Sequence, residues 1–502
     1  MKYLSLLCLT LLLGACEKPT KPTAQAPAAD APGTISRSVV RINSTSQAWN
    51  PGQPWEKTPP QSLRSLGAIV GPGQVLTTSE MVADTTFLEL ELPDGSKTAE
   101  AVVIAVDYEA NIALLTVKSE AERNEFFKDT QPIALAPRPS IGDTLEIFQI
   151  EDNATTIKTS GTLKSVSISN SFLPNQSFLT YMLKASMQGA ASSFSLPVTR
   201  DGKLAGLLLS YSSEDQLCDV LSIDVISRFL GNIKDGAYAG FPSLGVAIAS
   251  TEDPAFRKFL KLSDSQGGIY ISSVKAGGSA DVAGVKEGDV LLSADGFPID
   301  MRGFYENPHY GLVFWGHIIR GEKTTGDSIK LALLRDGMPI EITAKLTRAE
   351  AKDKLVPDYQ FDRAPNFLVK GGLIFQELNR PFLEAFGKEW ASRAPLNLLD
   401  VFENPEKFVA TAKRVIFLSG SIPTPATVGY EGLRNFIVKK VNGIEIDSMK
   451  TLIEAFEKPN AENLHAIEFR EENFTVYLDE AVSTAVDRAL LQRGLNMLSR
   501  AE

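Results

Sequence analysis

Short apolar runs separated by glycine, proline and aspartate turns dominate residues 38–232. The stretch Leu88-Glu89-Leu90-Glu91-Leu92 alternates apolar and acidic residues, which is the period-two pattern of a strand with one buried and one solvated face. Asp94-Gly95 follows it directly and is a hairpin-turn signal. Short strands repeated at this spacing predict an all-β barrel or sandwich for this part of the chain.

A second pattern begins near residue 242, where short strands alternate with a small-residue helix around residues 280–284 and a hairpin turn at Asp336-Gly337. A comparable order recurs over residues 367–478, so the later unit is interpreted as a diverged copy of the earlier one. Residues 480–500 are apolar at helical intervals and contain one glycine, Gly494, which predicts a closing C-terminal helix.

The N-terminus predicts export and lipidation. Lys2 precedes an apolar stretch at residues 4–13 that is too short to span a bilayer, and Leu13-Gly14-Ala15-Cys16 follows at once. This order resembles a bacterial lipobox, which implies that Cys16 carries diacylglycerol; the alternative is an ordinary secretory peptide that happens to contain cysteine. Glu17 is not the aspartate that enforces inner-membrane retention. We therefore expect a lipid-anchored protein of the cell envelope, on the outer membrane, that faces the periplasm or the exterior.

Composition limits the partners. The chain has 502 residues, so it is long enough for about two to four domains. Its formal net charge is -11 and it has no basic run, which argues against nucleic acid and favours polypeptide partners. Residues 17–36 are rich in proline and alanine and predict an extended tether. After processing only Cys16 and Cys218 remain, so no intramolecular disulfide is expected, and Cys218 is interpreted as a packed thiol.

Several motifs together resemble the Deg/HtrA serine proteases, and the plant-type members with two PDZ domains most closely. The motifs are Ser38-Val39-Val40-Arg41-Ile42, Gly67-Ala68-Ile69-Val70, Asn111-Ile112-Ala113-Leu114-Leu115, Gly240-Phe241-Pro242-Ser243-Leu244-Gly245-Val246, Val285-Lys286-Glu287-Gly288-Asp289-Val290-Leu291, Asn366-Phe367-Leu368-Val369-Lys370-Gly371-Gly372-Leu373-Ile374-Phe375 and Gly429-Tyr430-Glu431.

This resemblance implies a mainly β chain with α+β modules, namely a trypsin-like double β-barrel followed by two PDZ domains. The expected parts are the signal peptide with its lipobox (residues 1–16), the tether (17–36), the protease-fold domain (37–236), PDZ domain 1 (240–349), a PDZ-like domain 2 (364–480) and the C-terminal helix (481–502).

The family's catalytic positions are replaced. Its Leu-Thr-Asn-x-His segment stands here as Leu76-Thr77-Thr78-Ser79-Glu80, with Glu80 in place of the histidine. Its Asp-x-Ala-Leu-Leu segment begins with Asn111, which removes the carboxylate that orients a histidine. The nucleophile loop stands as Ala191-Ser192-Ser193-Phe194-Ser195-Leu196, so Ser193 is retained without the glycines that shape an oxyanion hole. We therefore expect no catalytic residue at Glu80, Asn111 or Ser193.

Three functions follow from these substitutions. The first is a catalytically inactive homologue that binds peptides or unfolded proteins as an adaptor, scaffold or chaperone-like factor. The second is an active serine endopeptidase of envelope protein quality control, in which Glu80 would act as base for Ser193; the sequence identifies no residue that would orient Glu80. The third is a structural subunit of homo-oligomers or of mixed oligomers with an active paralogue.

The PDZ regions offer the binding sites. The resemblance places a carboxylate loop at Ser243, Leu244, Gly245 and Val246, a peptide-pairing strand continuing through Ala247 and Ile248, and a groove-side helix over residues 314–320. In the second region, Lys370, Gly371, Gly372 and Leu373 are a second candidate loop, with an internal structural role as the alternative.

No cofactor or metal is expected. His309 and His317 lie eight residues apart, a spacing that fits one helix face, but the sequence supplies no third ligand. Packing or solvent exposure is therefore the favoured interpretation of both side chains.

Overall fold

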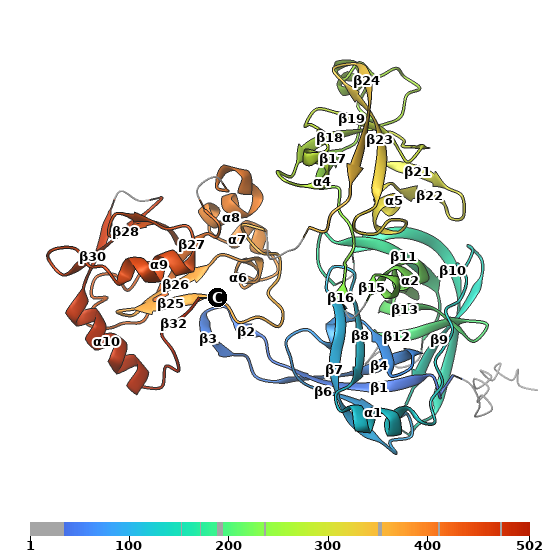
Figure 1. Cartoon of the computed structure of the whole chain (residues 1–502), viewed down its shortest axis with the longest axis horizontal. Coiled ribbons are helices and arrows are strands. Elements are labelled where there is room, and N and C mark those ends of the chain that lie inside the picture. Colours follow the sequence, from blue (N-terminus) through green and yellow to red (C-terminus); the bar gives the residue numbers. More distant parts are fainter. Residues whose placement is uncertain are drawn as a thin grey trace, which may run out of the picture.

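The computed structural model describes residues 35–151, 153–170, 172–187, 194–234, 237–349, 354–409, 412–471 and 474–501. The predicted signal peptide and Cys16 lie outside the described residues, and so does Ser193. Figure 1 shows three bodies: a β-rich body formed by the first half of the chain, a smaller body stacked on it, and a third body at the far side that ends in the C-terminus.

The β-rich body consists of two closed barrels of six strands. In order round the first barrel, the strands are β1 (Val39–Ser46), β4 (Gln61–Gly71), β5 (Gln74–Thr77), β8 (Ile112–Val117), β7 (Thr98–Asp107) and β6 (Thr85–Glu91). The second barrel has β10 (Thr156–Asn170), β11 (Ser177–Lys184), β14 (Leu217–Ser222), β13 (Lys203–Ser212), β12 (Leu196–Arg200) and β9 (Thr144–Ile150). Leu88 and Leu90 of β6 are buried as their alternation predicts, and the predicted double-barrel fold is confirmed.

Two helices flank the barrels. Helix α1 (Glu120–Phe127) begins at Ser119, whose hydroxyl accepts a hydrogen bond from the Glu122 N–H. Helix α2 (Ile223–Gly231) begins at Ser222, which caps the helix in the same way through the Val225 N–H. Helix α2 directly follows the last strand of the second barrel, so it carries the chain toward the next domain.

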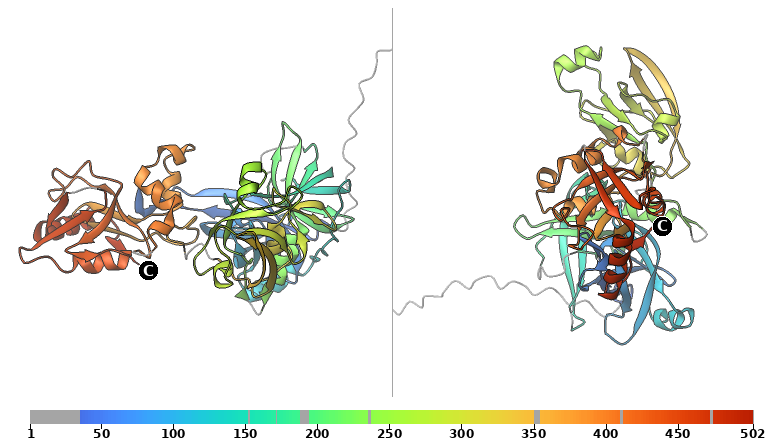
Figure 2. Two further views of the ribbon diagram at one scale, coloured as in Figure 1. Left: turned by 90° about the horizontal axis from the view of Figure 1, so that it is seen from above. Right: turned by 90° about the vertical axis from the view of Figure 1, so that its left-hand side faces the viewer.

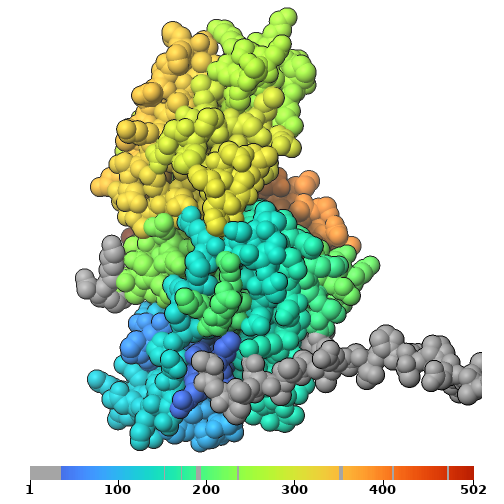
Figure 3. Space-filling model, turned by 90° about the vertical axis from the view of Figure 1, so that its right-hand side faces the viewer, coloured from blue at the N-terminus to red at the C-terminus, as the bar shows by residue number. Residues whose placement is uncertain are grey.

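The first PDZ region is a sheet in the order β17 (Val246–Ala249), β18 (Ile269–Val274), β19 (Val290–Ala294), β23 (Ser328–Arg335) and β24 (Met338–Lys345). Its short helices are α3 (Pro254–Phe259), α4 (Ser279–Val282) and α5 (Gly316–Arg320), and β21 (Phe304–Asn307) forms a hairpin with β22 (Gly311–Phe314). This region sits directly on the second barrel (Figure 3) and shares one continuous apolar core with it, in which the rings of Phe178 and Phe241 are 4.8 Å apart.

The second PDZ region has a sheet in the order β31 (Thr475–Asp479), β30 (Leu464–Phe469), β28 (Phe436–Val441), β27 (Ile416–Ser421), β26 (Leu373–Glu377), β25 (Phe367–Lys370) and β32 (Ser499–Arg500). Its helices include α6 (Arg380–Glu384), α7 (Trp390–Arg393), α8 (Leu396–Glu403), α9 (Met449–Phe456) and α10 (Glu480–Gln492). The predicted C-terminal helix is therefore shorter than expected, because Gly494 adopts a φ of +107° and the chain turns back to pair β32 with β25.

A hairpin arm connects the first barrel to the second PDZ region. Beyond the barrel, the β1–β4 hairpin ends in β2 (Trp49–Asn50) and β3 (Gln53–Lys57), which reach the C-terminal body in both Figure 1 and Figure 2. The Trp55 ring joins an apolar cluster with Phe367 and Leu490 of that body, and it is 7% exposed. The arm therefore contributes a core side chain to a domain more than 300 residues away in sequence.

Cys218 is buried on β14, as predicted for a packed thiol. Burial raises the pKa of this thiol to about 12, so it stays protonated at neutral pH. Among the described residues, none of the helices combines the length and the apolar character needed to cross a membrane.

Candidate functional site

The residues at the expected base and orienting positions form a hydrogen-bonded pair. Glu80 lies in the 3₁₀ turn after β5 (Ser79–Met81), and Asn111 directly precedes β8. Asn111 Nδ2 donates to Glu80 Oε1 at 2.6 Å. On its other side, Asn111 Oδ1 accepts from the Ser79 hydroxyl at 3.0 Å and from the Glu80 N–H at 3.3 Å. The fold thus brings Glu80 and Asn111 together as the resemblance implies, and the polar groups of Asn111 are satisfied by its neighbours.

Glu80 has an orienting partner that the sequence did not identify. Burial raises the pKa of its carboxyl group, and the hydrogen bond from Asn111 partly opposes that shift. Asn111 is neutral, so it holds the Glu80 side chain by a hydrogen bond and supplies no negative charge of the kind that the aspartate of a triad places beside a charged histidine. The arrangement offers a carboxylate fixed beside the barrel interface.

The nucleophile loop is described only from Phe194 onward. Ser195, which stands in place of a glycine of the family's nucleophile loop, has a left-handed backbone with φ of +53°. Its hydroxyl is 2.7 Å from the Thr77 hydroxyl and accepts from the Thr78 N–H at 3.0 Å. A left-handed backbone is unfavourable for serine, and the two buried hydrogen bonds stabilise it here. Ser195 therefore joins the loop to the end of β5.

The segment between the PDZ regions packs beside the Glu80–Asn111 pair. In this linker segment, defined here as Tyr359-Gln360-Phe361-Asp362, the Phe361 ring is 4.7 Å from the ring of Tyr108, which lies three residues before Asn111. The N–H groups of Asp84 and Asp362 each donate to the other residue's carboxylate, at 3.0 and 2.9 Å. The chain's own linker segment thus covers the surface flanking the expected catalytic positions.

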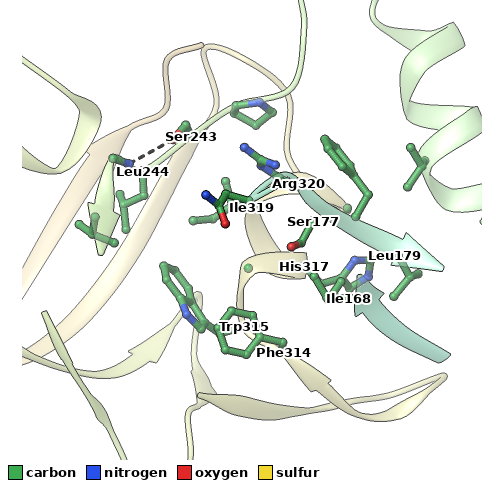
Figure 4. Close-up of a pocket in the computed structure, with 18 residues that line it drawn as sticks. Ile168, Ser177, Leu179, Ser243, Leu244, Phe314, Trp315, His317, Ile319 and Arg320 are labelled. Atoms are coloured by element: carbon green, nitrogen blue, oxygen red, sulfur yellow. Dashed lines mark hydrogen bonds between the residues drawn. The ribbon is translucent and has the colours of Figure 1, made fainter. Parts of the chain in front are cut away.

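The first PDZ region contains a groove of about 270 Å³ between β17, α5 and the second barrel. In Figure 4, Ser243 and Leu244 lie on one side of it and Ser177, Leu179 and His317 on the other. Strand β17 pairs only with β18 among the described strands, so its other edge can accept an added strand. The groove-side helix begins at Gly316 rather than Phe314, since Phe314 belongs to β22.

The loop at the head of this groove is more occupied than expected. A carboxylate loop needs open N–H donors, but the Ser243 N–H donates to Thr347 O at 2.9 Å. The Gly245 N–H donates to the Ser243 hydroxyl at 3.2 Å (Figure 4). Gly245 has φ of +78°, a conformation that glycine adopts without strain. A carboxylate can therefore reach the Gly245 N–H only by replacing the Ser243 hydroxyl, which rotates freely about its Cα–Cβ bond.

Arg320 of α5 joins this groove to the second barrel. Its guanidinium donates to Gln176 Oε1 at 3.0 Å and lies 4.8 Å from the centre of the Phe178 ring. It also approaches Glu109, two residues before Asn111, with 3.5 Å between Nη2 and Oε2. Arg320 thus connects the wall of the groove to the segment that carries Asn111, through its ion pair with Glu109.

The second candidate loop is filled by the chain itself. The Gly371 N–H donates to the Asp487 carboxylate of α10 at 2.7 Å, and Lys370 Nζ lies 2.8 Å from Glu480. Gly372, with φ of +100°, leaves no room for a side chain because a Cβ there would stand 2.7 Å from Ile422 O. The edge of β26 that an added peptide would use is paired with β25. These contacts favour the internal structural role over ligand binding.

The histidines do not share one helix face. His309 lies in the β21–β22 turn and contacts Pro139 O at 3.1 Å, whereas His317 belongs to α5. His317 is buried as packing predicts, but Asp224 and Glu322 lie close enough to complete a three-ligand cluster. His309 does not belong to this cluster, so the prediction of no metal site at the two histidines stays a prediction; Asp224 comes from a distant segment, whereas Glu322 lies only five residues after His317.

Comparisons with known proteins agree with this architecture. Family models described as "PDZ domain" match residues 242–303 and residues 356–495. Protease Do-like 2, chloroplastic, of Arabidopsis thaliana is 25% identical over 461 residues, covering 90% of this chain and 73% of the relative. Protease Do-like 4, mitochondrial, of the same plant is 24% identical over 432 residues, covering 85% and 78%.

Among solved structures, the HtrA-type protease AlgW with tripeptide matches 63% of this chain and 96% of its own, with 17% identity and a TM-score of 0.47. This chain is thus similar to Do-like proteases over most of its length, and PDZ domain models match two parts of it, as the resemblance implies.

Proposed function

We propose that this chain is a catalytically inactive Deg/HtrA-type protein that binds peptides or unfolded polypeptides through its first PDZ domain. The observation that carries the proposal is the Glu80–Asn111 hydrogen bond at the positions of base and orienting acid. A general base must lie within hydrogen-bond reach of the nucleophile. The three histidines of the chain stand at positions 309, 317 and 465, all in the PDZ domains, so none belongs to the protease part.

Two further features support loss of catalysis. Removing a whole triad costs on the order of 10⁶-fold in acyl transfer, and Phe194 replaces a glycine of the oxyanion loop. The linker segment also packs against Tyr108, three residues before Asn111. A working endopeptidase would need Glu80 as its base, and its activity would depend on Ser193.

The remaining activity is recognition of a polypeptide C-terminus. The unpaired edge of β17 supplies backbone hydrogen bonds, and the apolar side chains of Leu244, Val246 and Ile319 line the groove beside it. Binding of this kind uses backbone geometry, so it survives the loss of the catalytic residues.

The test is binding of a C-terminal peptide library to the full chain, measured by fluorescence polarisation with free and amidated versions of each ligand. Amidation should weaken binding about tenfold or more, because a charge-assisted hydrogen bond contributes roughly 1.5–3 kcal/mol. Gly245→Trp should abolish binding. Gly296→Trp is the matched control, since Gly296 has a similar φ of +84° in a turn away from the groove. Equal binding of free and amidated peptides would refute carboxylate recognition and leave the structural-subunit function.

We also propose that Cys16 is lipidated and anchors the chain to the outer membrane. The support is the Leu13-Gly14-Ala15-Cys16 order with Glu17 after it. A diacylglycerol group provides two acyl chains and hence stable anchoring. Cys16→Ser should move the protein from the membrane fraction to the soluble fraction, and unchanged fractionation would contradict the anchor.

A further inference from the structure

Three potential metal ligands meet where the first PDZ domain rests on the second barrel. Asp224 comes from α2 of the barrel, His317 from α5, and Glu322 from the turn after α5. Their ligand atoms all lie within 4.8 Å of one another. The side chains of Asp224 and His317 are 0% and 1% exposed, so these groups are withdrawn from water.

The buried imidazole is not fully satisfied. His317 Nε2 has no aligned hydrogen-bond partner, and its nearest acidic atom is Glu322 Oε1 at 3.5 Å. A lone pair on Nε2 is the usual coordinating atom of histidine. The imidazole is thus available to a cation at the centre of the cluster.

The carboxylate of Asp224 is held in a fixed orientation. The hydroxyls of Tyr181 and Tyr310 donate to Asp224 Oδ2 at 3.0 and 2.7 Å. Hydrogen bonds of this kind orient metal-ligating carboxylates from a second layer of residues. They leave Oδ1 as the oxygen that faces the cluster.

A guanidinium now occupies the position that a cation would take. Arg138 Nε lies 2.5 Å from Asp224 Oδ1 in an ion pair without hydrogen-bond alignment, and Arg138 Nη2 donates to Glu322 Oε1 at 2.9 Å. Asp224 and Glu322 bring two carboxylates to the junction, and Arg138 places one guanidinium beside them. The Arg138 side chain is 40% exposed, so it can withdraw into solvent. A divalent cation in its place would neutralise the cluster.

From this geometry we infer that Asp224, His317 and Glu322 form a binding site for Zn²⁺ or a similar divalent transition-metal ion. The bound ion displaces Arg138 and links the first PDZ domain to the barrel. One imidazole and two carboxylates suit zinc, whose bonds to nitrogen and oxygen are about 2.0–2.2 Å, so the three side chains draw closer when the ion binds. A water molecule completes the tetrahedral set. His317 also lines the PDZ groove, so the ion stiffens one wall of that groove.

The test titrates ZnCl₂ into the full chain and into three variants, with affinity measured by competition against a chelating dye. Arg138→Gln should bind more tightly by at least about tenfold, because it removes a competing unit charge. His317→Gln should lose about tenfold or more in affinity, since it removes one of three ligands. His309→Gln is the matched control and should bind as the parent does, because its ring contacts Pro139 O outside the cluster.

A spectroscopic measurement keeps the inference testable if a variant unfolds. Co²⁺ bound to the parent chain should show the intense visible absorption of a tetrahedral site, with one equivalent bound. Absence of this spectrum in both parent and Arg138→Gln would overturn the site, as would an undiminished zinc affinity in folded His317→Gln. The peptide-binding assay is independent of this result, because the inference does not rest on the proposed function.

Discussion

The hairpin arm makes a quantitative prediction: Trp55→Ala should release the second PDZ domain from the first barrel. The indole lies in the cluster with Phe367, at 6.0 Å between ring centres, and is 7% exposed. Burying an aromatic side chain removes about 150–250 Å² from water, or roughly 4–6 kcal/mol at about 25 cal/mol per Å². Measured truncations of buried aromatic residues cost about 3–5 kcal/mol.

The backbone contacts of the arm survive this substitution. Asn496 Nδ2 donates to Trp55 O at 3.0 Å and Gln376 Nε2 donates to Pro51 O at 3.1 Å, and alanine keeps both acceptors. The predicted loss is therefore the side-chain contribution of about 3–5 kcal/mol, or roughly two to four powers of ten in the docking equilibrium.

The assay is amide hydrogen exchange of the full chain, read at β2, β3, β25 and β32. Protection in the arm should fall by the predicted factor, because exchange reports the free energy of local opening. Trp49→Ala is the control: its ring stacks with the Arg500 guanidinium at 4.6 Å, a contact that contributes only about 0.5–1 kcal/mol at an exposed site. Exchange in Trp55→Ala that matches Trp49→Ala would refute the assignment of Trp55 as the anchor.

Two other substitutions probe the site and the filled loop. Burial raises the pKa of the Glu80 carboxyl group, so the folded chain binds a proton at Glu80 more tightly than the unfolded chain does. The parent protein therefore loses stability as the pH rises from the ordinary pKa of glutamate through the higher pKa of the folded state. Glu80→Gln should therefore be more stable than the parent at pH 8, and the difference should shrink toward pH 4. Denaturant unfolding at both pH values measures this difference. A variant less stable than the parent at pH 8 would contradict the prediction. Asp487→Ala removes the acceptor of the Gly371 N–H and should cost about 1–3 kcal/mol in denaturant unfolding, whereas an unchanged midpoint would mean that the loop does not need this carboxylate.

Much of the fold follows from local patterns. Alternation in β6 and the turn at Asp94-Gly95 identify strands because side chains on a strand point to opposite faces. The family motifs then supply the order of the barrels and the PDZ domains. The proposed replacement of the catalytic histidine by Glu80 rests on the sequence alone, because Leu76-Thr77 and the later Asn111 segment match the motifs of the Deg/HtrA resemblance.

Contacts between segments far apart in the chain could not be predicted from local sequence patterns. The bond between Asn111 and Glu80 depends on side-chain rotamers across two strands, and the Asp84–Asp362 pair joins residues 278 positions apart. Asp487 fills a loop whose sequence alone is typical of ligand binding. The C-terminal helix ended early because a single glycine, Gly494, offered the left-handed turn that starts β32.

The most direct test of the central claim is incubation of the full chain with unfolded casein, with new peptide N-termini quantified by mass spectrometry. The parent and Ser193→Ala should give the same background, because the position of the catalytic histidine holds Glu80 and the position of its orienting aspartate holds Asn111. Cleavage by the parent that disappears in Ser193→Ala would contradict the account and establish a serine endopeptidase.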